Sequence, residues 1–341
     1  MRICVAGAGA IGGFLAAKLA LAGHDVSVLA RGAHCEAIRS GGLTLIDQHG
    51  GTQQTIGVRA AEADRLAELG EQELVILALK AHQIADLVPR LDVLLSATTP
   101  VVALQNGLPW WYFHRHGGRF DGRRLESVDP GGLIARHLPV ERVIGCVAHK
   151  GAEISAPGVV RHVATAGDRF PVGEPDGSRS ARVEAISAVL NGAWVAAPVI
   201  TNIRTEKWFK LWGNLVWNPI CALTHATVLD LSEAPIANEL GVTMMLEAQA
   251  VAARLGVSIP GTPQARLARA REVGHVRPSM LQDTQAGRRL EIDALLGVIV
   301  ELARLTGTAV PSIEAIYACA KLLDKVLAER RVRIVPQSLT A

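Results

Sequence analysis

The sequence predicts an α/β domain built on a parallel sheet, followed by an all-α helical domain. Short apolar runs alternate with helical patterns through the first part of the chain, as in parallel sheets that helices cover on both faces. From residue 204 onward the pattern is helical, with turn signals rich in glycine and proline. The 341 residues are enough for two cores, and we place the first domain at residues 1–200 and the second at 201–341.

The first strands of the sheet follow from apolar runs. Residues 2–6 are typical of a buried strand, residues 14–21 of a helix that Gly23 ends, and residues 24–32 of the next strand. Together they fit into about thirty residues, the span of a βαβ unit. Two further runs, residues 73–80 and 99–107, are expected to extend the same sheet.

A long irregular connection follows over residues 107–145. It carries four consecutive aromatic residues at 110–113, for which we predict core packing, with a role in substrate selection as the second hypothesis. Beyond the connection, we expect a helix at about residues 180–190 and strands that complete the sheet at residues 141–149, 158–164 and 168–174.

Composition excludes several classes of protein. The chain is 49% hydrophobic and 20% charged, and no apolar run approaches the roughly 20 residues that span a bilayer. A formal net charge of +3, without a dense run of Lys and Arg, does not favour a nucleic-acid partner. The five cysteines and eleven histidines show no metal-ligand spacing, so we expect no metal and a cytoplasmic protein with reduced thiols.

The turn after the first strand carries the pattern G-x-G-x-x-G, formed by Gly7, Gly9 and Gly12. The first glycine permits a tight turn, the second lets the backbone approach a pyrophosphate, and the third lets helix and strand pack closely. The position of these glycines, after a strand and at the start of a helix, favours a dinucleotide site over a purely structural turn. Lys18 interrupts the apolar run that a secretory leader would need. The sequence therefore predicts a Rossmann-type dinucleotide-binding domain whose turn consists of Gly7, Ala8, Gly9, Ala10, Ile11 and Gly12.

The end of the second strand indicates which dinucleotide binds. NAD sites usually carry an acidic residue there, whereas an arginine suits the 2′-phosphate of NADP. This chain has Arg31 at that place and no carboxylate between Asp25 and Glu36, so we predict NADP. The alternative is that Arg31 is an ordinary solvated charge.

Residues 202–224 predict a helix with one polar stripe. At about 100° per residue, Lys210, Asn214 and Asn218 share one face with Glu206 and Lys207, while most of the remaining surface is apolar. A helix of this kind is buried apart from a polar cleft that the stripe lines. The alternatives are that Lys210 reaches solvent and that the asparagines cap loops. Pro219 predicts a kink at Asn218.

A second helical segment, residues 277–307, places a carboxylate in its apolar stripe. Glu291 lies in the middle of that stripe, so we expect it to be buried and functional, whereas Asp293 belongs to the opposite, solvated face. The alternatives for Glu291 are a helix N-terminus or a structural ion pair. Ser279 and Gln282 match a capping box, alone or combined with ligand binding.

These segments together resemble the ketopantoate reductase (2-dehydropantoate 2-reductase) family. The resemblance covers nearly the whole chain and is carried by the motifs "GAGAIGG", "LALKAHQ", "LQNG", "KLWGNLVWNP" and "SMLQD" followed by "EID". It implies a Rossmann domain followed by a helical domain, an active site in the cleft between them, and NADPH-dependent reduction of 2-dehydropantoate to pantoate in pantothenate biosynthesis.

The resemblance also implies a role for each candidate residue. The glycine turn would bind the pyrophosphate and Arg31 the 2′-phosphate, and Lys80 and Asn106 would approach cofactor and substrate. Lys210 would be the catalytic lysine, and Glu291 would contact the substrate or the cofactor. The residues that would bind the substrate are Asn106, Asn214, Asn218 and Ser279.

Two departures from the family pattern leave the substrate open. The connection after Asn106 is long and aromatic, and Val228 stands where the family often has another substrate-binding asparagine. The second hypothesis is therefore an NADPH-dependent reductase of a different 2-oxo acid or ketone. A third is a non-catalytic NADP-binding protein, which the retained lysine argues against. A homodimer is compatible with the apolar helical domain.

Overall fold

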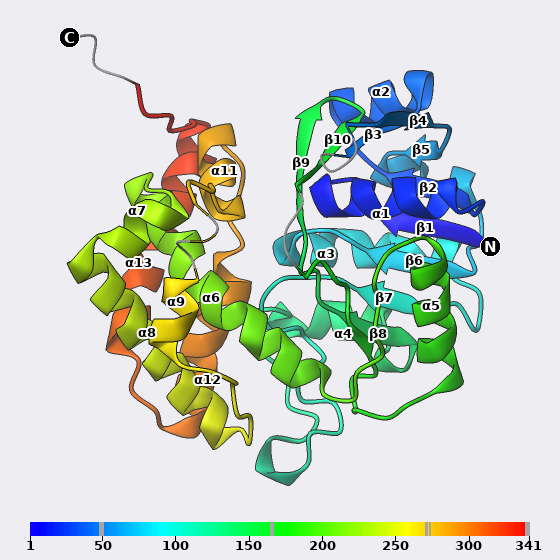
Figure 1. The fold of residues 1–341 in the computed structure, drawn as a ribbon. Coiled ribbons are helices and arrows are strands. Elements are labelled where there is room, and N and C mark those ends of the chain that lie inside the picture. Colours follow the sequence, from blue (N-terminus) through cyan, green and yellow to red (C-terminus); the bar gives the residue numbers. More distant parts are fainter. Residues whose placement is uncertain (48–50, 164–166, 270–271, 273, 338–341) are drawn as a thin grey trace. The chain divides into compact units, whose positions relative to one another are not determined.

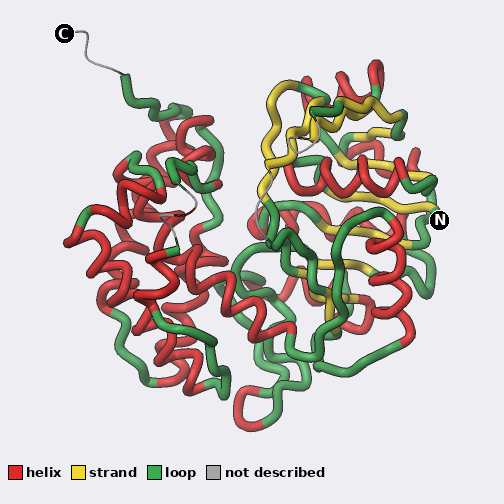
Figure 2. Tube along the Cα trace, viewed as in Figure 1, coloured by secondary structure: helices red, strands yellow, loops and turns green. Residues whose placement is uncertain are grey.

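Two units of packed structure make up the chain, which the computed structural model describes over residues 1–47, 51–163, 167–269, 272 and 274–337 (Figure 1). The first unit contains Met1–Gln105, Trp110–Arg124 and Asp129–Ile203. The second contains Asn106–Pro109, Leu125–Val128 and Arg204–Ala341. Figure 2 shows the strands, in yellow, within the first unit, while the second consists of helices and connecting loops.

A seven-stranded sheet forms the centre of the first unit, in the order β11-β8-β7-β6-β1-β2-β5. All its pairings are parallel except that of β11 with β8. Strand β1 pairs with β2 on one side and with β6 on the other, so the topology reverses direction at β1, where doubly wound sheets bind ligands. The strands are β1 (Arg2–Ala6), β2 (Asp25–Leu29), β5 (Arg59–Ala61), β6 (Leu74–Leu77), β7 (Val101–Ala103), β8 (Val143–Cys146) and β11 (Val172–Gly173).

Helices and short helical turns connect these strands. Helix α1 (Ala10–Leu21) directly follows β1, and its apolar residues join the core of the unit. Helix α5 begins after Ser180. The Ser180 hydroxyl accepts a hydrogen bond from the N–H of Val183, which is the usual role of a serine at an N-cap. The α-helices are α2 (Gly32–Gly41), α3 (Ala81–Leu87), α4 (Leu133–His137) and α5 (Ala181–Gly192); the 3-10 turns are η1 (Ala63–Leu69), η2 (Val88–Leu94), η3 (Gly118–Phe120), η4 (Pro130–Gly132) and η5 (Val140–Arg142).

A second, four-stranded sheet was not predicted. It has the order β4-β3-β10-β9, with β3 (Leu43–Asp47), β4 (Gln53–Ile56), β9 (Gly151–Ala156) and β10 (Val159–Val163). The prediction that residues 158–164 complete the main sheet was therefore wrong, and residue 164 lies outside the described part of the chain. β8 and β11 do join the main sheet. A strand's pattern reveals its burial, but its pairing partners are chosen by tertiary packing.

The second sheet packs against helix α1. A Cβ on Gly13 would lie 2.7 Å from Cγ2 of Val160, so this close contact requires glycine. The ammonium of Lys150 contacts Asp168 and lies 4.5 Å from the ring centre of Phe14 on α1. Burial lowers the pKa of Lys150, while Asp168 acts in the opposite direction.

The long connection is packed rather than open. All four aromatic residues of 110–113 are buried, and Phe113 contacts the ring of Phe120, which confirms the predicted role in core packing. Further along, the carboxylate of Glu301 accepts the N–H groups of Glu126 and Ser127 at 2.9 and 2.8 Å. These two hydrogen bonds connect the segment Leu125–Val128 to α12 within the second unit.

The second unit is built from helices, as the sequence predicts. Trp208 and Trp212 of α6 are completely buried, and Trp212 Nε1 donates to the carbonyl oxygen of Met245 on α8 at 2.8 Å. Within the described residues, no helix is long and apolar enough to cross a membrane. The helices are α6 (Ile203–Thr224), α7 (Val228–Glu233), α8 (Pro235–Arg254), α9 (Pro263–Ala268), α11 (Ser279–Ala286), the π-helical η6 (Asp293–Gly297), α12 (Val298–Thr306) and α13 (Pro311–Arg330).

Helix α13 is capped by a carboxylate from another helix. Its own N-cap residue, Val310, offers no side-chain acceptor. Instead, the two carboxylate oxygens of Glu247 on α8 accept the N–H groups of Ser312 and Ile313, each at 3.0 Å. These two hydrogen bonds link α8 to α13 and satisfy N–H groups that have no acceptor within α13.

We expect Glu247→Ala to lower the free energy of unfolding by about 1–3 kcal/mol, because two partly buried donors lose their acceptor. Denaturant unfolding of the parent and the variant measures this difference. Glu239 is exposed on the same helix, and Glu239→Ala should cost less than about 0.5 kcal/mol. Equal losses in the two variants would contradict the assigned cap.

Candidate active site

The glycine turn has the geometry that the sequence motif predicts. Gly7 has a φ of +114°, a conformation that favours glycine, and its N–H and that of Ala8 donate to the carbonyl oxygen of Leu29 at 3.2 and 2.7 Å. A Cβ on Gly12 would lie 1.9 Å from the carbonyl oxygen of Gly7 and 2.8 Å from Cβ of Ala78. The turn and the helix after it therefore pack too closely for any other residue at position 12.

Gly9 has a different environment from Gly12. It is the N-cap residue of α1 and supplies no side-chain hydrogen bond, and a Cβ built there would meet no atom within 4 Å. The first N–H groups of a helix lack intrahelical acceptors and carry the positive end of its dipole. Open space beside such donors fits a pyrophosphate. The residues of this turn, including Ala8, Ala10 and Ile11, thus fit a dinucleotide cofactor.

His34 supports the turn and has no signal in the sequence. Its Nδ1 accepts the N–H of Gly158 at 3.0 Å, so Nε2 carries the proton that it donates to the carbonyl oxygen of Ala8 at 2.8 Å. Burial lowers the pKa of His34, which favours the neutral ring that this pair of bonds requires. The side chain connects the glycine turn to the segment between β9 and β10.

Arg31 lies where the sequence expects it, but a carboxylate lies beside it. Arg31 is exposed at the end of β2 and is the N-cap residue of α2. The N–H of Gly32 donates to Oε1 of Glu62 at 2.8 Å. The sequence shows no acidic residue close to Arg31 along the chain. Glu62 instead follows the end of β5, which is the neighbour of β2 in the sheet.

Lys80 and Asn106 both follow the carboxyl ends of neighbouring parallel strands. β6 and β7 are paired through Leu77 and Ala103, and each side chain comes three residues after that pair. Lys80 belongs to the first unit, where its N–H donates to Oε1 of Gln83 at 3.3 Å at the start of α3. Asn106 belongs to the second unit.

The segment after Asn106 packs against the segment after Glu291. The N–H of Leu108 donates to the carbonyl oxygen of Ala294 at 3.3 Å, and a Cβ on Gly107 would lie 1.9 Å from that oxygen. Gly107 has a φ of +77°, so both its conformation and its surroundings require glycine. Within the second unit, the structure thus brings the chain around Asn106 to the chain around Glu291.

Glu291 is buried, as predicted, with 8% of its surface exposed. It immediately precedes a helical stretch that includes the π-helical segment η6, a geometry frequent at functional sites. The carboxylate of Asp324 accepts the N–H of Leu290 at 2.8 Å and the Nε of Arg289 at 3.0 Å. Asp324 therefore fixes the backbone immediately before Glu291.

The prediction for Asp293 agrees with the structure, whereas that for Ser279 was wrong. Asp293 keeps 43% of its side chain exposed, and its carboxylate also accepts hydrogen bonds from Tyr317 Oη at 2.7 Å and Lys321 Nζ at 3.0 Å. Burial first, and then Asp293, raise the pKa of the Tyr317 hydroxyl. Ser279 is the first residue of α11 rather than its cap, and Gln282 Nε2 donates to the carbonyl oxygen of Arg277 instead. The error at Ser279 comes from the helix starting one residue earlier than the capping pattern suggests.

Helix α6 carries the predicted polar stripe on one continuous helix. Trp208, Leu211, Trp212, Leu215 and Val216 are buried, which confirms that most of its surface packs against protein. On the stripe, Lys207 and Asn218 are buried, and Lys210 and Asn214 are half-buried. The helix continues through Pro219 to Thr224.

A cation that the sequence did not indicate packs on α6. The guanidinium of Arg266 lies 4.7 Å from the ring centre of Phe209 and 5.3 Å from that of Trp217. Burial, and then the charge of Arg269, lower the pKa of Arg266. The arginine of α9 and the aromatic residues of α6 thus stabilise each other by cation–π contact.

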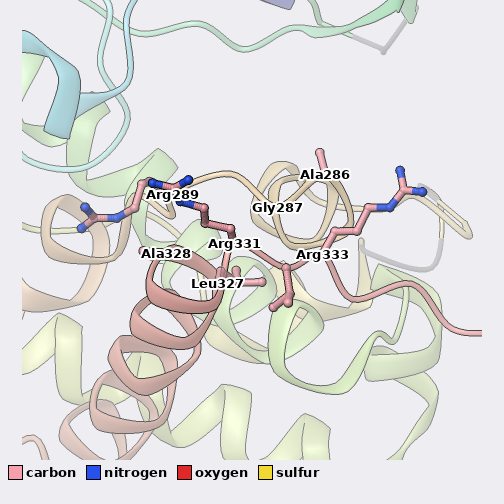
Figure 3. Close-up of a pocket in the computed structure, with 8 residues that line it drawn as sticks. Ala286, Gly287, Arg289, Leu327, Ala328, Arg331 and Arg333 are labelled. Carbon is pink, nitrogen blue, oxygen red and sulfur yellow. The ribbon is translucent and has the colours of Figure 1, made fainter.

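A cavity of about 410 Å³ lies elsewhere in the second unit, where α11 and α13 meet the C-terminal segment (Figure 3). None of the predicted site residues lines it. Its lining consists of arginine, aliphatic and small residues, namely Ala286, Gly287, Arg289, Leu327, Ala328, Arg331, Val332 and Arg333.

Comparison with known proteins shows the family. Residues 3–111 match the family described as "Ketopantoate reductase PanE/ApbA", and residues 202–324 match "Ketopantoate reductase PanE/ApbA C terminal". The chain is 48% identical over 324 residues to the 2-dehydropantoate 2-reductase of Mesorhizobium japonicum, covering 95% of this chain and 98% of that protein. The chain belongs to the ketopantoate reductase family.

Solved structures of ketopantoate reductases share the fold. A structure from Ralstonia solanacearum assigned to the ketopantoate reductases is 39% identical with a TM-score of 0.88, and the match covers 95% of this chain and 98% of that one. The 2-dehydropantoate 2-reductase of Geobacter metallireducens is 27% identical with a TM-score of 0.81, covering 94% and 99%. The predicted Rossmann-type domain followed by a helical domain is confirmed.

Replacing Gly12 and Gly9 by alanine should affect two different properties, stability and dinucleotide binding. Gly12→Ala should destabilise the fold, because its Cβ overlaps the backbone of Gly7. Gly9→Ala should cost less than about 1 kcal/mol of stability but weaken dinucleotide binding about tenfold or more, because the methyl group occupies open space beside the helix N-terminus. Thermal unfolding and titration with NADPH and NADH measure the two effects. Unchanged binding in Gly9→Ala would remove the turn from the cofactor site.

Proposed function

We propose that the chain catalyses the NADPH-dependent reduction of 2-dehydropantoate to pantoate, a step of pantothenate biosynthesis. The observation that carries the proposal is the 48% identity, over nearly the whole of both chains, to the 2-dehydropantoate 2-reductase of Mesorhizobium japonicum. The predicted catalytic lysine supports it, because Lys210 stands on the polar stripe of an otherwise buried helix in the matched C-terminal region.

The cofactor residues divide between two ends of a dinucleotide. Gly7 to Gly12 are proposed to bind the pyrophosphate, supported by the open space at Gly9 and the uncapped N-terminus of α1. Arg31 is proposed to bind the 2′-phosphate of NADP, supported by its exposed place at the end of β2. Lys80 and Asn106 are proposed to approach the nicotinamide end and the substrate, supported by their places beyond the ends of β6 and β7.

The chemistry required at the substrate explains the polar residues of the second unit. When bound, NADPH supplies a hydride to the C2 carbonyl carbon of a 2-oxo acid. The carbonyl oxygen then gains negative charge, and Lys210 is proposed to stabilise that oxygen and donate a proton to it. This proton and hydride together turn the ketone into a hydroxyl. Glu291 is proposed to help keep Lys210 protonated and to contact the substrate or the cofactor.

The remaining polar residues are proposed to orient the substrate. Asn106, Asn214, Asn218 and Ser279 offer amides and a hydroxyl, which bind a carboxylate without adding negative charge. Their support is the buried or half-buried state of Asn214 and Asn218 on α6 and the packing of the Asn106 segment against that of Glu291. The substrate is thus a small 2-oxo acid; a homodimer and a cytoplasmic location stay predictions.

One observation favours a second candidate, the reduction of a different 2-oxo acid or ketone. Val228 stands where the family pattern often has a substrate-binding asparagine, and here it begins α7 as a buried apolar residue. An apolar group at that position would suit a bulkier or less polar substrate. The two candidates share Lys210 and differ only in the compound reduced.

NADPH oxidation with 2-dehydropantoate, beside a panel of other 2-oxo acids, tests the proposal. Lys210→Ala should lower kcat about 100-fold to 10,000-fold for every accepted substrate while the protein stays folded. Lys325→Ala is the matched control, because Lys325 is exposed and, among the residues that the structure describes, pairs only with Glu329 on its own helix. Negligible turnover of 2-dehydropantoate beside good turnover of another acid would select the second candidate. An unchanged kcat in Lys210→Ala would remove the lysine from the mechanism.

Arg31→Ala should weaken NADPH binding about 10-fold to 100-fold and leave NADH binding nearly unchanged, because only NADPH carries the 2′-phosphate. Titration of both coenzymes in the absence of substrate measures this. Arg39→Ala removes an exposed arginine from the other end of α2 and should change neither affinity by more than about twofold. Equal weakening of NADPH and NADH by Arg31→Ala would contradict the assigned role.

A further inference from the structure

Glu62 reaches the same edge of the sheet as Arg31. β5 and β2 are parallel neighbours, with Ala61 opposite Leu29 and the N–H of Ala30 donating to the carbonyl oxygen of Ala61 at 3.1 Å. Glu62 comes directly after that pair on one strand, and Arg31 two residues after it on the other. An anion bound at Arg31 would therefore have this carboxylate in its neighbourhood.

The carboxylate already occupies the N-terminus of α2. Gly32 is the first residue of that helix, and its N–H donates to Glu62 Oε1 at 2.8 Å. The N-cap residue Arg31 supplies no side-chain cap of its own. A helix N-terminus at this place would otherwise favour a phosphate. Here its first N–H is bonded to a protein anion instead.

Other charges around α2 do not cancel the effect of Glu62. Arg31 forms no ion pair within the described residues. Glu36 and Arg39 on α2 have opposite charges, as do Asp64 and Arg65 on η1, and Arg65 pairs with Glu68. Burial first, and Glu62 second, raise the pKa of the Cys35 thiol in the first turn of α2, the direction expected from a carboxylate bonded to the start of this helix.

We propose that Glu62 sets coenzyme selectivity by opposing the 2′-phosphate that Arg31 attracts. This inference rests on the proposed NADP-dependent function. Repulsion between the carboxylate and a doubly charged phosphate reduces the advantage of NADPH over NADH. The second carboxylate oxygen has no bonded partner within the described residues, so it remains an acceptor of the kind that binds ribose hydroxyls in NAD sites. The chain therefore binds both coenzymes, with a smaller preference for NADPH than Arg31 alone would produce.

Glu62→Gln separates this role from helix capping. Glutamine retains Oε1 as an acceptor for Gly32 N–H and removes only the negative charge. The probes are 2′,5′-ADP and 5′-AMP, which differ by the 2′-phosphate and need no turnover, titrated by calorimetry alongside NADPH and NADH. We expect 2′,5′-ADP and NADPH to bind about threefold to tenfold more tightly to Glu62→Gln, and 5′-AMP and NADH equally or more weakly. The gain should shrink at high salt.

Asp64→Asn is the matched control, because it removes the same charge from an exposed residue two positions along the chain. It should change the ratio of 2′,5′-ADP to 5′-AMP affinity by less than about twofold. An unchanged ratio in Glu62→Gln, or an equal change in Asp64→Asn, would overturn the inference while leaving the proposed function intact. If neither nucleotide bound the parent protein, the proposed function would fail, and the inference with it.

Discussion

The close contact between helix α1 and the end of strand β1 sets the geometry of the first unit. No Cβ fits at position 12, where the helix touches the carbonyl oxygen of Gly7. The other side of α1 is held by the second sheet, through Val160 against Gly13 and the Lys150 ammonium over the ring of Phe14. A helix held from both sides keeps its first N–H groups in place before any ligand arrives, so binding need not spend free energy on ordering them.

Carboxylates that lie outside the helix satisfy the N–H groups at several other helix starts. Glu62 bonds the first residue of α2, Asp129 the N–H groups of Ile134 and Ala135 in α4, and Glu247 those at the start of α13. Asp324 does the same for Leu290 before Glu291. By contrast, α1 begins at Gly9 without a side-chain cap. The helix that the proposed function assigns to the pyrophosphate is thus one that the protein leaves uncapped.

The second unit buries several of the polar residues to which the proposed function assigns a role. Glu291 and Asn218 are buried, and Lys210 and Asn214 are half-buried on a helix whose other faces carry Trp208 and Trp212. Burying a charged or amide group costs free energy unless it is bonded, so such groups are expected where chemistry requires them. The separation of polar stripe from apolar faces on α6 is what connects the fold to the proposed reduction.

The sequence by itself determined the first βαβ unit of the doubly wound domain, its later strands at β6 and β7, the glycine turn, the polar stripe of α6 and the burial of Glu291. Each of these depends on periodicity or on close neighbours along the chain, which a single sequence displays. Only the tertiary structure decided that β10 joins a second sheet, that Asp293 bonds Tyr317, and that Ser279 does not cap α11. It also brought Glu62 beside Arg31, from 31 positions away along the chain. Pairing between strands and bonds between distant side chains depend on how elements pack, and no local pattern encodes the partner.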